Sequence, residues 1–228
     1  MQSKLVFVSV LLLIAATNGA PSAQTRYDVI IQAGHQGRPE DCKSKGGPES
    51  ESLCHNTGSP VLPGEKVWTP IVADEAARIL EAAGVKVLRL PGYVPDTYRV
   101  KAAVFIHFDG ADKPCSSGAS VGYPPGSSPD AAIADAWRRL YAAHWPYKVM
   151  SDNFTTNERD YYAYRHVIAS KGEFLMEGGE MSCPKQYAWL KDHLNWEAAL
   201  LAHFLSDQIG KGHVPMPHPA NRPPTSFK

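Results

Sequence analysis

Four residues that can bind a metal or transfer a proton stand at corresponding places along this chain. His35, His107 and Glu177 each end a short apolar run. In open parallel sheets, chemistry gathers at the carboxyl ends of the strands, so three such runs would aim these side chains at one edge. Glu65 follows Pro-Gly and opens a helical pattern. Catalytic zinc commonly takes three N/O ligands, two His and one Glu among the known sets, and keeps one position for water. The four residues therefore predict a metal site with a spare carboxylate.

The elements that would position these residues alternate along the chain. Apolar runs predict strands over residues 27–33, 85–90, 102–107, 120–123 and 173–177. Apolar stripes at helical spacing predict helices over residues 65–83, 129–141 and 184–209, with a short helical stretch over 161–170. This alternation is typical of an α/β domain whose sheet is covered by helices on both faces.

The ends of the chain differ in composition from the middle. Residues 1–23 read as a signal peptide, because Lys4 precedes an apolar run over 5–16 and small residues follow it. That run is shorter than the roughly 20 apolar residues of a membrane span. Residues 24–210 then form a single catalytic domain, and the proline-rich residues 211–228 are expected to be a disordered tail. The mature protein is expected to be periplasmic or extracellular.

Charge and cysteine content narrow the possible partners of the protein and the compartment in which it folds. The 228 residues carry 23 basic and 23 acidic side chains, so nothing favours a nucleic-acid or anionic-membrane partner. Four cysteines in an exported chain predict two disulfides, for which three pairings exist. We expect Cys42–Cys54, which share one polar loop, and Cys115–Cys183, which follow the ends of two strands that carry site residues.

Four sequence blocks together resemble a known family. They are Val29-Ile-Ile-Gln-Ala-Gly-His-Gln-Gly37, Gly64-Glu-Lys66, Val104-Phe-Ile-His107 and Leu175-Met-Glu-Gly-Gly179. In these blocks the chain resembles the zinc-dependent N-acetylmuramoyl-L-alanine amidases of the Amidase_3 type, over residues 28–209. The resemblance implies a twisted, mostly parallel sheet and one Zn²⁺ per chain, with His35, Glu65 and His107 as ligands. It also implies Glu177 as the catalytic glutamate and peptidoglycan or a muropeptide as substrate.

One block departs from the family pattern. The pattern Glu-x-Gly-Phe-x-Ser-Asn reads Glu177-Gly-Gly-Glu-Met-Ser-Cys183 here, so Glu180 and Cys183 replace the Phe and the Asn. Glu180 thereby becomes a rival to Glu177 as general base. Glu177 is the preferred candidate, because it ends the strand directly and fits the register of the motif.

Other residues and other functions stay open on the sequence alone. His55, Asp109 and Arg99 could assist at the site, and three tyrosines could line a groove for glycan or peptide: Tyr93, Tyr123 and Tyr147. The expected enzyme is a monomeric amidase that cleaves between the muramyl lactyl group and L-alanine. The alternatives are a zinc exopeptidase or another amidohydrolase with the same site, and a non-catalytic cell-wall or metal-binding module.

Overall fold

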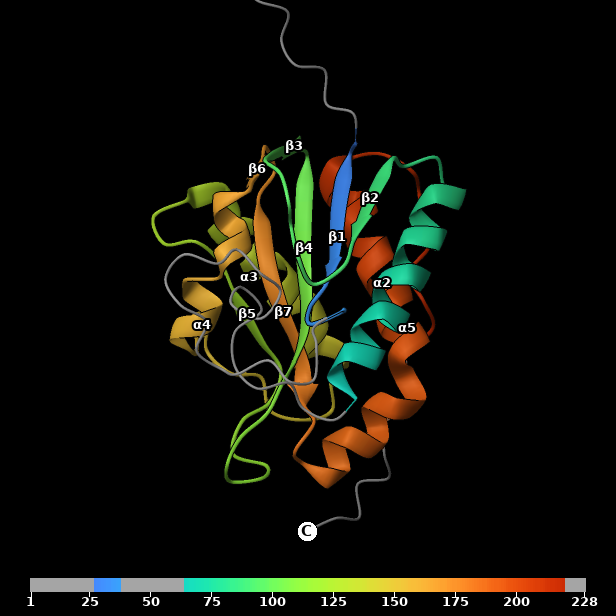
Figure 1. Ribbon diagram of the computed structural model, residues 1–228. Helices are drawn as coiled ribbons and strands as arrows, with labels where there is room; N and C mark the ends of the chain where they lie inside the picture. Colours follow the sequence, from blue (N-terminus) through green and yellow to red (C-terminus); the bar gives the residue numbers. More distant parts are fainter. Residues whose placement is uncertain (1–26, 38–63, 220–228) are drawn as a thin grey trace, which may run out of the picture.

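A five-stranded sheet forms the centre of the fold (Figure 1). A computed structural model of the chain describes residues 27–37 and 64–219. The strands lie in the order β2 (Val87–Leu90), β1 (Val29–Ala33), β4 (Ala102–Asp109), β7 (Glu173–Glu180) and β5 (Ser120–Gly122). The pairs β1–β2, β1–β4 and β4–β7 are parallel, and β5 runs antiparallel to β7. The predicted α/β class with a mostly parallel sheet is confirmed.

Three long helices pack on one face of this sheet. They are α2 (Glu65–Ala82), α3 (Ser128–His144) and α5 (Pro184–Ile209), and their apolar stripes join one core cluster with the sheet residues of that face. In β4 the side chains alternate between the two faces. Ile106 and Phe108 join the core with the long helices, whereas Phe105 joins a second cluster on the opposite face.

The opposite face has a thinner cover. It consists of the 3₁₀ helix η1 (Tyr162–Arg165) and the small parallel sheet of β3 (Tyr98–Val100) and β6 (Val167–Ala169), with the short helix α4 (Thr156–Arg159) beside β5. Among the described elements, the helical cover is therefore unequal between the two faces. The expected helical stretch over 161–170 is half correct, because its second half pairs with β3 as a strand.

The first part of the proline-rich tail differs from the expected disordered extension. Val214 is buried, and its carbonyl accepts a hydrogen bond from His203 Nδ1 at 2.7 Å. Trp196 Nε1 donates to the carbonyl of His218, and the Lys211 ammonium pairs with Asp28. Residues 211–219 thus pack onto α5 and the start of the sheet. The predicted signal peptide lies outside the described residues, and none of the helices described combines the length and apolarity that crossing a bilayer would need.

Candidate metal centre

The structure brings His35, Glu65 and His107 together, as predicted. Their ligating atoms all lie within 4.8 Å of one another, and all three residues are buried. Glu65 Oε1 lies 3.4 Å from His35 Nε2 and 3.3 Å from His107 Nδ1. One carboxylate oxygen between two imidazole nitrogens is a donor set that suits a borderline-soft divalent cation such as zinc.

The turn after β1 fixes His35. The Gly34 amide donates to Ile106 O at 2.8 Å, so the chain stays against β4 beyond the end of the strand. A Cβ atom on Gly34 would lie only 2.4 Å from His107 Nε2, so only glycine leaves room for that ring. His35 itself has φ 58°, a left-handed conformation that residues other than glycine seldom adopt. Such strain costs on the order of 1–3 kcal/mol and persists where surrounding contacts enforce it.

Helix α2 positions Glu65 from the other side. Gly64 precedes the helix with φ 99°, and its carbonyl accepts hydrogen bonds from the amides of Val67 and Trp68. One turn into the helix, Thr69 Oγ1 donates to Gly34 O at 2.6 Å. This buried bond between a side chain and the backbone ties the helix to the turn that carries His35, and so restricts the distance between the two candidate ligands.

His107 lies in β4 with both ring nitrogens engaged. Nδ1 faces Glu65, and Nε2 lies 3.1 Å from the hydroxyl of Tyr161. Burial lowers the pKa of His107 to about 3, so the imidazole is neutral at physiological pH. A neutral imidazole is the form that binds a metal.

Glu177 is the neighbour of His107 across the sheet, in register in β7. Among the described residues its Oε2 atom is buried without a hydrogen-bond partner. Burial raises the pKa of Glu177 well above its usual value, and the negative charges of Glu65, Asp109 and Glu158 raise it further. The arrangement gives a second carboxyl group at the same edge with an unused oxygen.

Glu180 has a different environment from Glu177. Its carboxylate accepts hydrogen bonds from the amides of Cys115 and Ser117 at 2.6 and 2.7 Å, and from Ser182 Oγ at 2.6 Å. Burial alone would raise the pKa of Glu180, but these bonds hold it below the ordinary value. Glu180 is therefore a fixed anion that anchors the β4–β5 loop, which favours Glu177 over Glu180 as the proton carrier.

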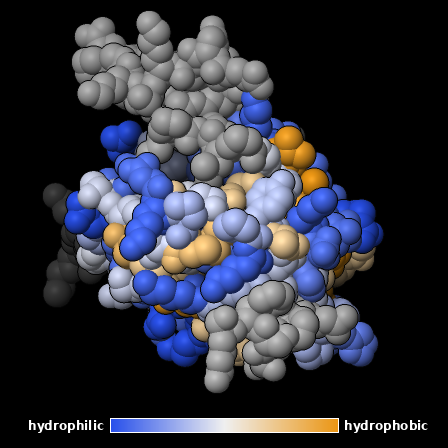
Figure 2. All heavy atoms as spheres, turned by 90° about the horizontal axis from the view of Figure 1, so that it is seen from below, coloured by the Kyte–Doolittle hydropathy of each residue, from blue (hydrophilic) through white to orange (hydrophobic). Residues whose placement is uncertain are grey.

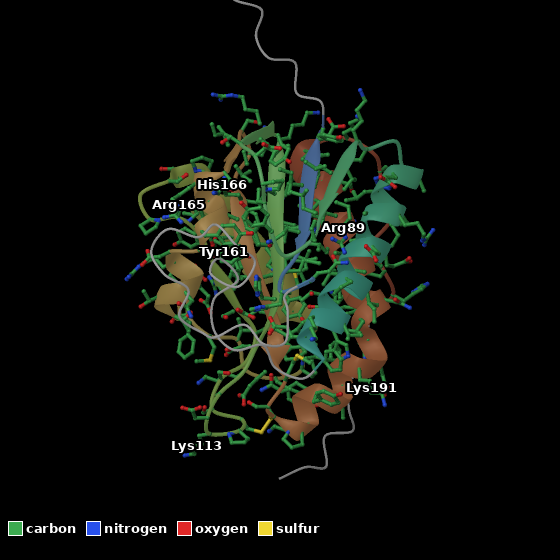
Figure 3. All side chains as sticks on the ribbon, in the orientation of Figure 1. Arg89, Lys113, Tyr161, Arg165, His166 and Lys191 are labelled. Atoms are coloured by element: carbon green, nitrogen blue, oxygen red, sulfur yellow. A yellow bond between two sulfur atoms is a disulfide. The ribbon has the colours of Figure 1, made fainter. Side chains whose placement is uncertain are left out.

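A disulfide joins Cys115 to Cys183 beside this anchor, as predicted. It is the yellow bond near Lys113 at the lower end of Figure 3. It links the β4–β5 loop to the start of α5, so both flanks of the Glu177 strand end are tied together. The predicted Cys42–Cys54 bond lies outside the described residues.

Of the other residues that the sequence offered for the site, Asp109 lies near the metal centre and the rest have other surroundings or lie outside the described residues. Asp109 ends β4 at the same edge as His107 and adds to the charge that raises the pKa of Glu177. Arg99 is exposed in β3, which belongs to the other sheet. Tyr93 stacks on Tyr162, and His55 lies outside the described residues. Tyr147 and Tyr123 bond to backbone and loop groups: the Tyr147 hydroxyl donates to Lys185 O, and the Tyr123 amide donates to Asn153 Oδ1.

Three residues that support the centre were not singled out from the sequence. Tyr161 contacts the candidate ligand His107, Gln32 accepts a hydrogen bond from Tyr161, and Thr69 holds the turn before His35. Thr69 had a signal, since it follows Glu65 by four positions and therefore shares its helix face. Tyr161 had none, because it reaches His107 across 54 positions of sequence.

No protein-family model and no curated protein matches the chain in sequence. Solved structures do match it. An N-acetylmuramyl-L-alanine amidase from Mycobacterium smegmatis superposes with a TM-score of 0.60 at 18% identity, over 82% of this chain and 98% of that one. The catalytic domain of an N-acetylmuramoyl-L-alanine amidase from Bacillus (Paenibacillus) polymyxa gives 0.56 at 18% identity, over 81% and 99%. An N-acetylmuramoyl-L-alanine amidase of Nostoc punctiforme gives 0.54 at 17% identity, over 81% and 98%. The chain therefore has the fold of these amidase catalytic domains.

Proposed function

We propose that this chain is a zinc-dependent N-acetylmuramoyl-L-alanine amidase, which hydrolyses the amide between N-acetylmuramic acid and L-alanine of peptidoglycan stem peptides. The observation that carries the proposal is the buried group of His35, Glu65 and His107, with Glu177 in register beside it at the carboxyl edge of the sheet. The fold shared with three amidases of that activity supports the same substrate class.

The residues present fit a zinc ion. His35 and His107 would supply two neutral imidazoles, and Glu65 would supply one carboxylate oxygen. A zinc ion so held lowers the pKa of a bound water to about 7 and polarises a carbonyl oxygen, which is the chemistry that amide hydrolysis needs. Three protein ligands leave a fourth position for that water.

Glu177 would act as general base and then as general acid. It would take the proton of the attacking water and deliver it to the leaving amine of L-alanine. A raised pKa suits this exchange, because a group that must accept and release a proton works best when its pKa is near the working pH. Its unpartnered buried oxygen, among the described residues, is available to a water molecule.

The surroundings are consistent with an exported enzyme on a polar polymer. The Cys115–Cys183 disulfide is typical of oxidising compartments, which supports the signal peptide proposed for residues 1–23. Seen toward the edge where β7 ends, hydrophilic residues dominate the described surface and hydrophobic residues form only small areas (Figure 2). Such a face suits a glycan and peptide substrate better than a lipid.

The test is digestion of purified peptidoglycan by the zinc-loaded protein, with the released fragments identified by mass. Release of intact stem peptides with a free L-alanine amine is the expected result. Release of single amino acids would instead identify an exopeptidase, and binding without release would identify a non-catalytic module.

The variant Glu177→Gln separates catalysis from metal binding. It should keep its zinc and its fold but lose about 10²–10⁴-fold in turnover, because general acid–base catalysis is typically worth that much. Glu180→Gln is the matched control. It should lower the stability of the fold, because Glu180 anchors the β4–β5 loop, but its turnover should equal that of the wild type at a temperature at which the variant stays folded. Near wild-type turnover of Glu177→Gln together with an inactive Glu180→Gln would exchange the two roles.

A further inference from the structure

A chain of buried hydrogen bonds runs from the candidate ligand His107 into the second core. His107 Nε2 lies 3.1 Å from Tyr161 Oη, and Tyr161 Oη lies 3.0 Å from Gln32 Oε1. Gln32 is fully buried, and Tyr161 nearly so. Tyr161, which is labelled in Figure 3, directly precedes η1. Its ring packs against those of Phe105 and His107, with centroids 5.4 and 5.2 Å away.

The far end of this chain fixes the direction of every bond. The carbonyl of Gly92 can only accept, and it receives hydrogen bonds from Tyr162 Oη at 2.8 Å and Gln32 Nε2 at 2.9 Å. The amide of Val94 can only donate, and it donates to Tyr162 Oη. The Gln32 side chain is therefore oriented with its nitrogen toward Gly92 and its Oε1 toward Tyr161.

The orientation of Gln32 determines which atom accepts the single hydroxyl proton of Tyr161. It goes to Gln32 Oε1, which can only accept, so Tyr161 Oη must act as acceptor toward His107. His107 then carries its proton on Nε2, and Nδ1 keeps its lone pair. That lone pair faces Glu65 Oε1 at 3.3 Å, and two such electron-rich atoms repel each other unless a cation lies between them.

We infer that Tyr161 is a positioning residue that holds His107 in the Nε2-protonated tautomer and so presents Nδ1 to the metal, with Gln32 as the group that sets the direction of its hydroxyl. The inference rests on the proposed metal centre and adds to it the residues that contact its ligand His107. Metal-bound histidines commonly donate their second N–H to such a partner, and loss of the partner typically costs about 10–100-fold in metal affinity or activity.

The experiment compares Tyr161→Phe with Tyr162→Phe in the full chain. Both variants remove one hydroxyl from the same buried cluster, but the Tyr162 hydroxyl bonds to Gly92, Gln32 and Val94 and interacts with Tyr161, with no bond to His107. In Tyr162→Phe the bond from Gln32 Nε2 to Gly92 O still orients Gln32 toward Tyr161. Urea unfolding of the two metal-free proteins shows whether the stability losses match. Zinc affinity, measured by competition with a chromogenic chelator, should fall by about 10–100-fold in Tyr161→Phe and stay at the wild-type value in Tyr162→Phe.

Histidine NMR of the metal-free protein gives a readout that does not depend on zinc. Long-range proton–nitrogen correlation distinguishes the two neutral tautomers, and the His107 signal is assigned by its absence in His107→Gln. The wild type and Tyr162→Phe should show the Nε2-protonated form. Tyr161→Phe should gain the Nδ1-protonated form, because a proton on Nδ1 can then be donated to Glu65.

Two results would overturn the inference alone: an unchanged tautomer and unchanged zinc affinity in Tyr161→Phe, or an equal loss of zinc affinity in Tyr162→Phe. A wild-type protein that binds no zinc would overturn the metal centre and the inference with it. The two failures are therefore distinguishable.

Discussion

Glu197 provides a prediction about how stability depends on pH. It is fully buried in α5, and its Oε1 lies 3.0 Å from Tyr141 Oη. The Tyr141 hydroxyl has a single proton and lies within hydrogen-bond distance of two acceptors, Gly178 O at 2.7 Å and Glu197 Oε1. Burial raises the pKa of Glu197 from 4.5 to about 8, although the hydrogen bond from Tyr141 acts against the rise, so Glu197 is mainly a neutral acid in the folded protein at pH 7.

The sign and size of the effect follow from these two values. Between pH 4.5 and about 8, the unfolded chain has released this proton while the folded protein still binds it. Raising the pH through this window therefore favours unfolding, at about 1.4 kcal/mol for each pH unit. The total is on the order of 5 kcal/mol, which is a large part of the roughly 5–15 kcal/mol that stabilises a typical domain.

The perturbation is Glu197→Gln, which keeps the shape and can donate an amide proton to Tyr141 but does not titrate. Relative to the wild type, the variant should gain stability steadily as the pH rises, by up to about 5 kcal/mol at the upper end of the window. The assay is urea unfolding of metal-free wild type and variant from about pH 5 to about pH 9, because the difference at each pH isolates this one group.

Glu75→Gln is the control for that assay. Glu75 lies on the surface of α2, and its hydrogen bond from Arg78 lowers its pKa, so it is ionised across the whole range. The stability difference between this control and the wild type should not change with pH. A Glu197→Gln difference that is equally constant, or that falls with rising pH, would refute the assignment of Glu197 as a neutral buried acid.

Two further substitutions test the geometry around the centre. Gly34→Ala should abolish tight zinc binding and cost about 1–3 kcal/mol, because its Cβ would lie 2.4 Å from His107 Nε2 and 2.5 Å from Ile106 O. Zinc titration and urea unfolding check this, and an alanine variant with wild-type zinc affinity would contradict it. Replacing Cys115 and Cys183 together by alanine should cost about 2–5 kcal/mol, measured by thermal unfolding with and without reductant. If reductant lowered the stability of the double variant as much as that of the wild type, the effect would not come from this disulfide.

The sequence was informative where structure depends on local pattern. The predicted helix from Glu65 and the predicted helix from Pro184 to Ile209 both agree with the structure, because each has an apolar stripe and a defined start. The strand ends that carry His107 and Glu177 could be aligned from sequence, because parallel strands end at one edge.

Contacts between segments that are distant in the sequence could not be predicted in the same way, because no local sequence pattern accompanies them. Nothing near Tyr161 predicts that it reaches Gln32, which lies 129 positions earlier. The strands β3 and β6 are three residues each, too short for a periodic pattern, and they form only because each supplies the other with backbone partners. The tail up to residue 219 reads as polar and proline-rich, yet backbone carbonyls in it accept bonds from His203 and Trp196.

Glu180 and Cys183, the two residues that depart from the family block, form one structural unit. Cys183 is bonded to Cys115, and the amide of the same Cys115 donates to Glu180. The irregular end of β7 directly precedes this unit, because the pairing with β4 shifts register between Glu177 and Glu180. A Cβ atom on Gly178 in this bulge would lie 2.4 Å from Glu197 Oε1, so only glycine fits at this position. A bulge changes the direction of the side chains beside it. On one side of this bulge lie the Cys115–Cys183 disulfide and the hydrogen-bonded carboxylate of Glu180, and on the other side lie Tyr141 and Glu197. The two departures therefore act together: where the resembled pattern has a Phe and an Asn, this chain has a hydrogen-bonded carboxylate and a disulfide that tie the β4–β5 loop to the segment after β7.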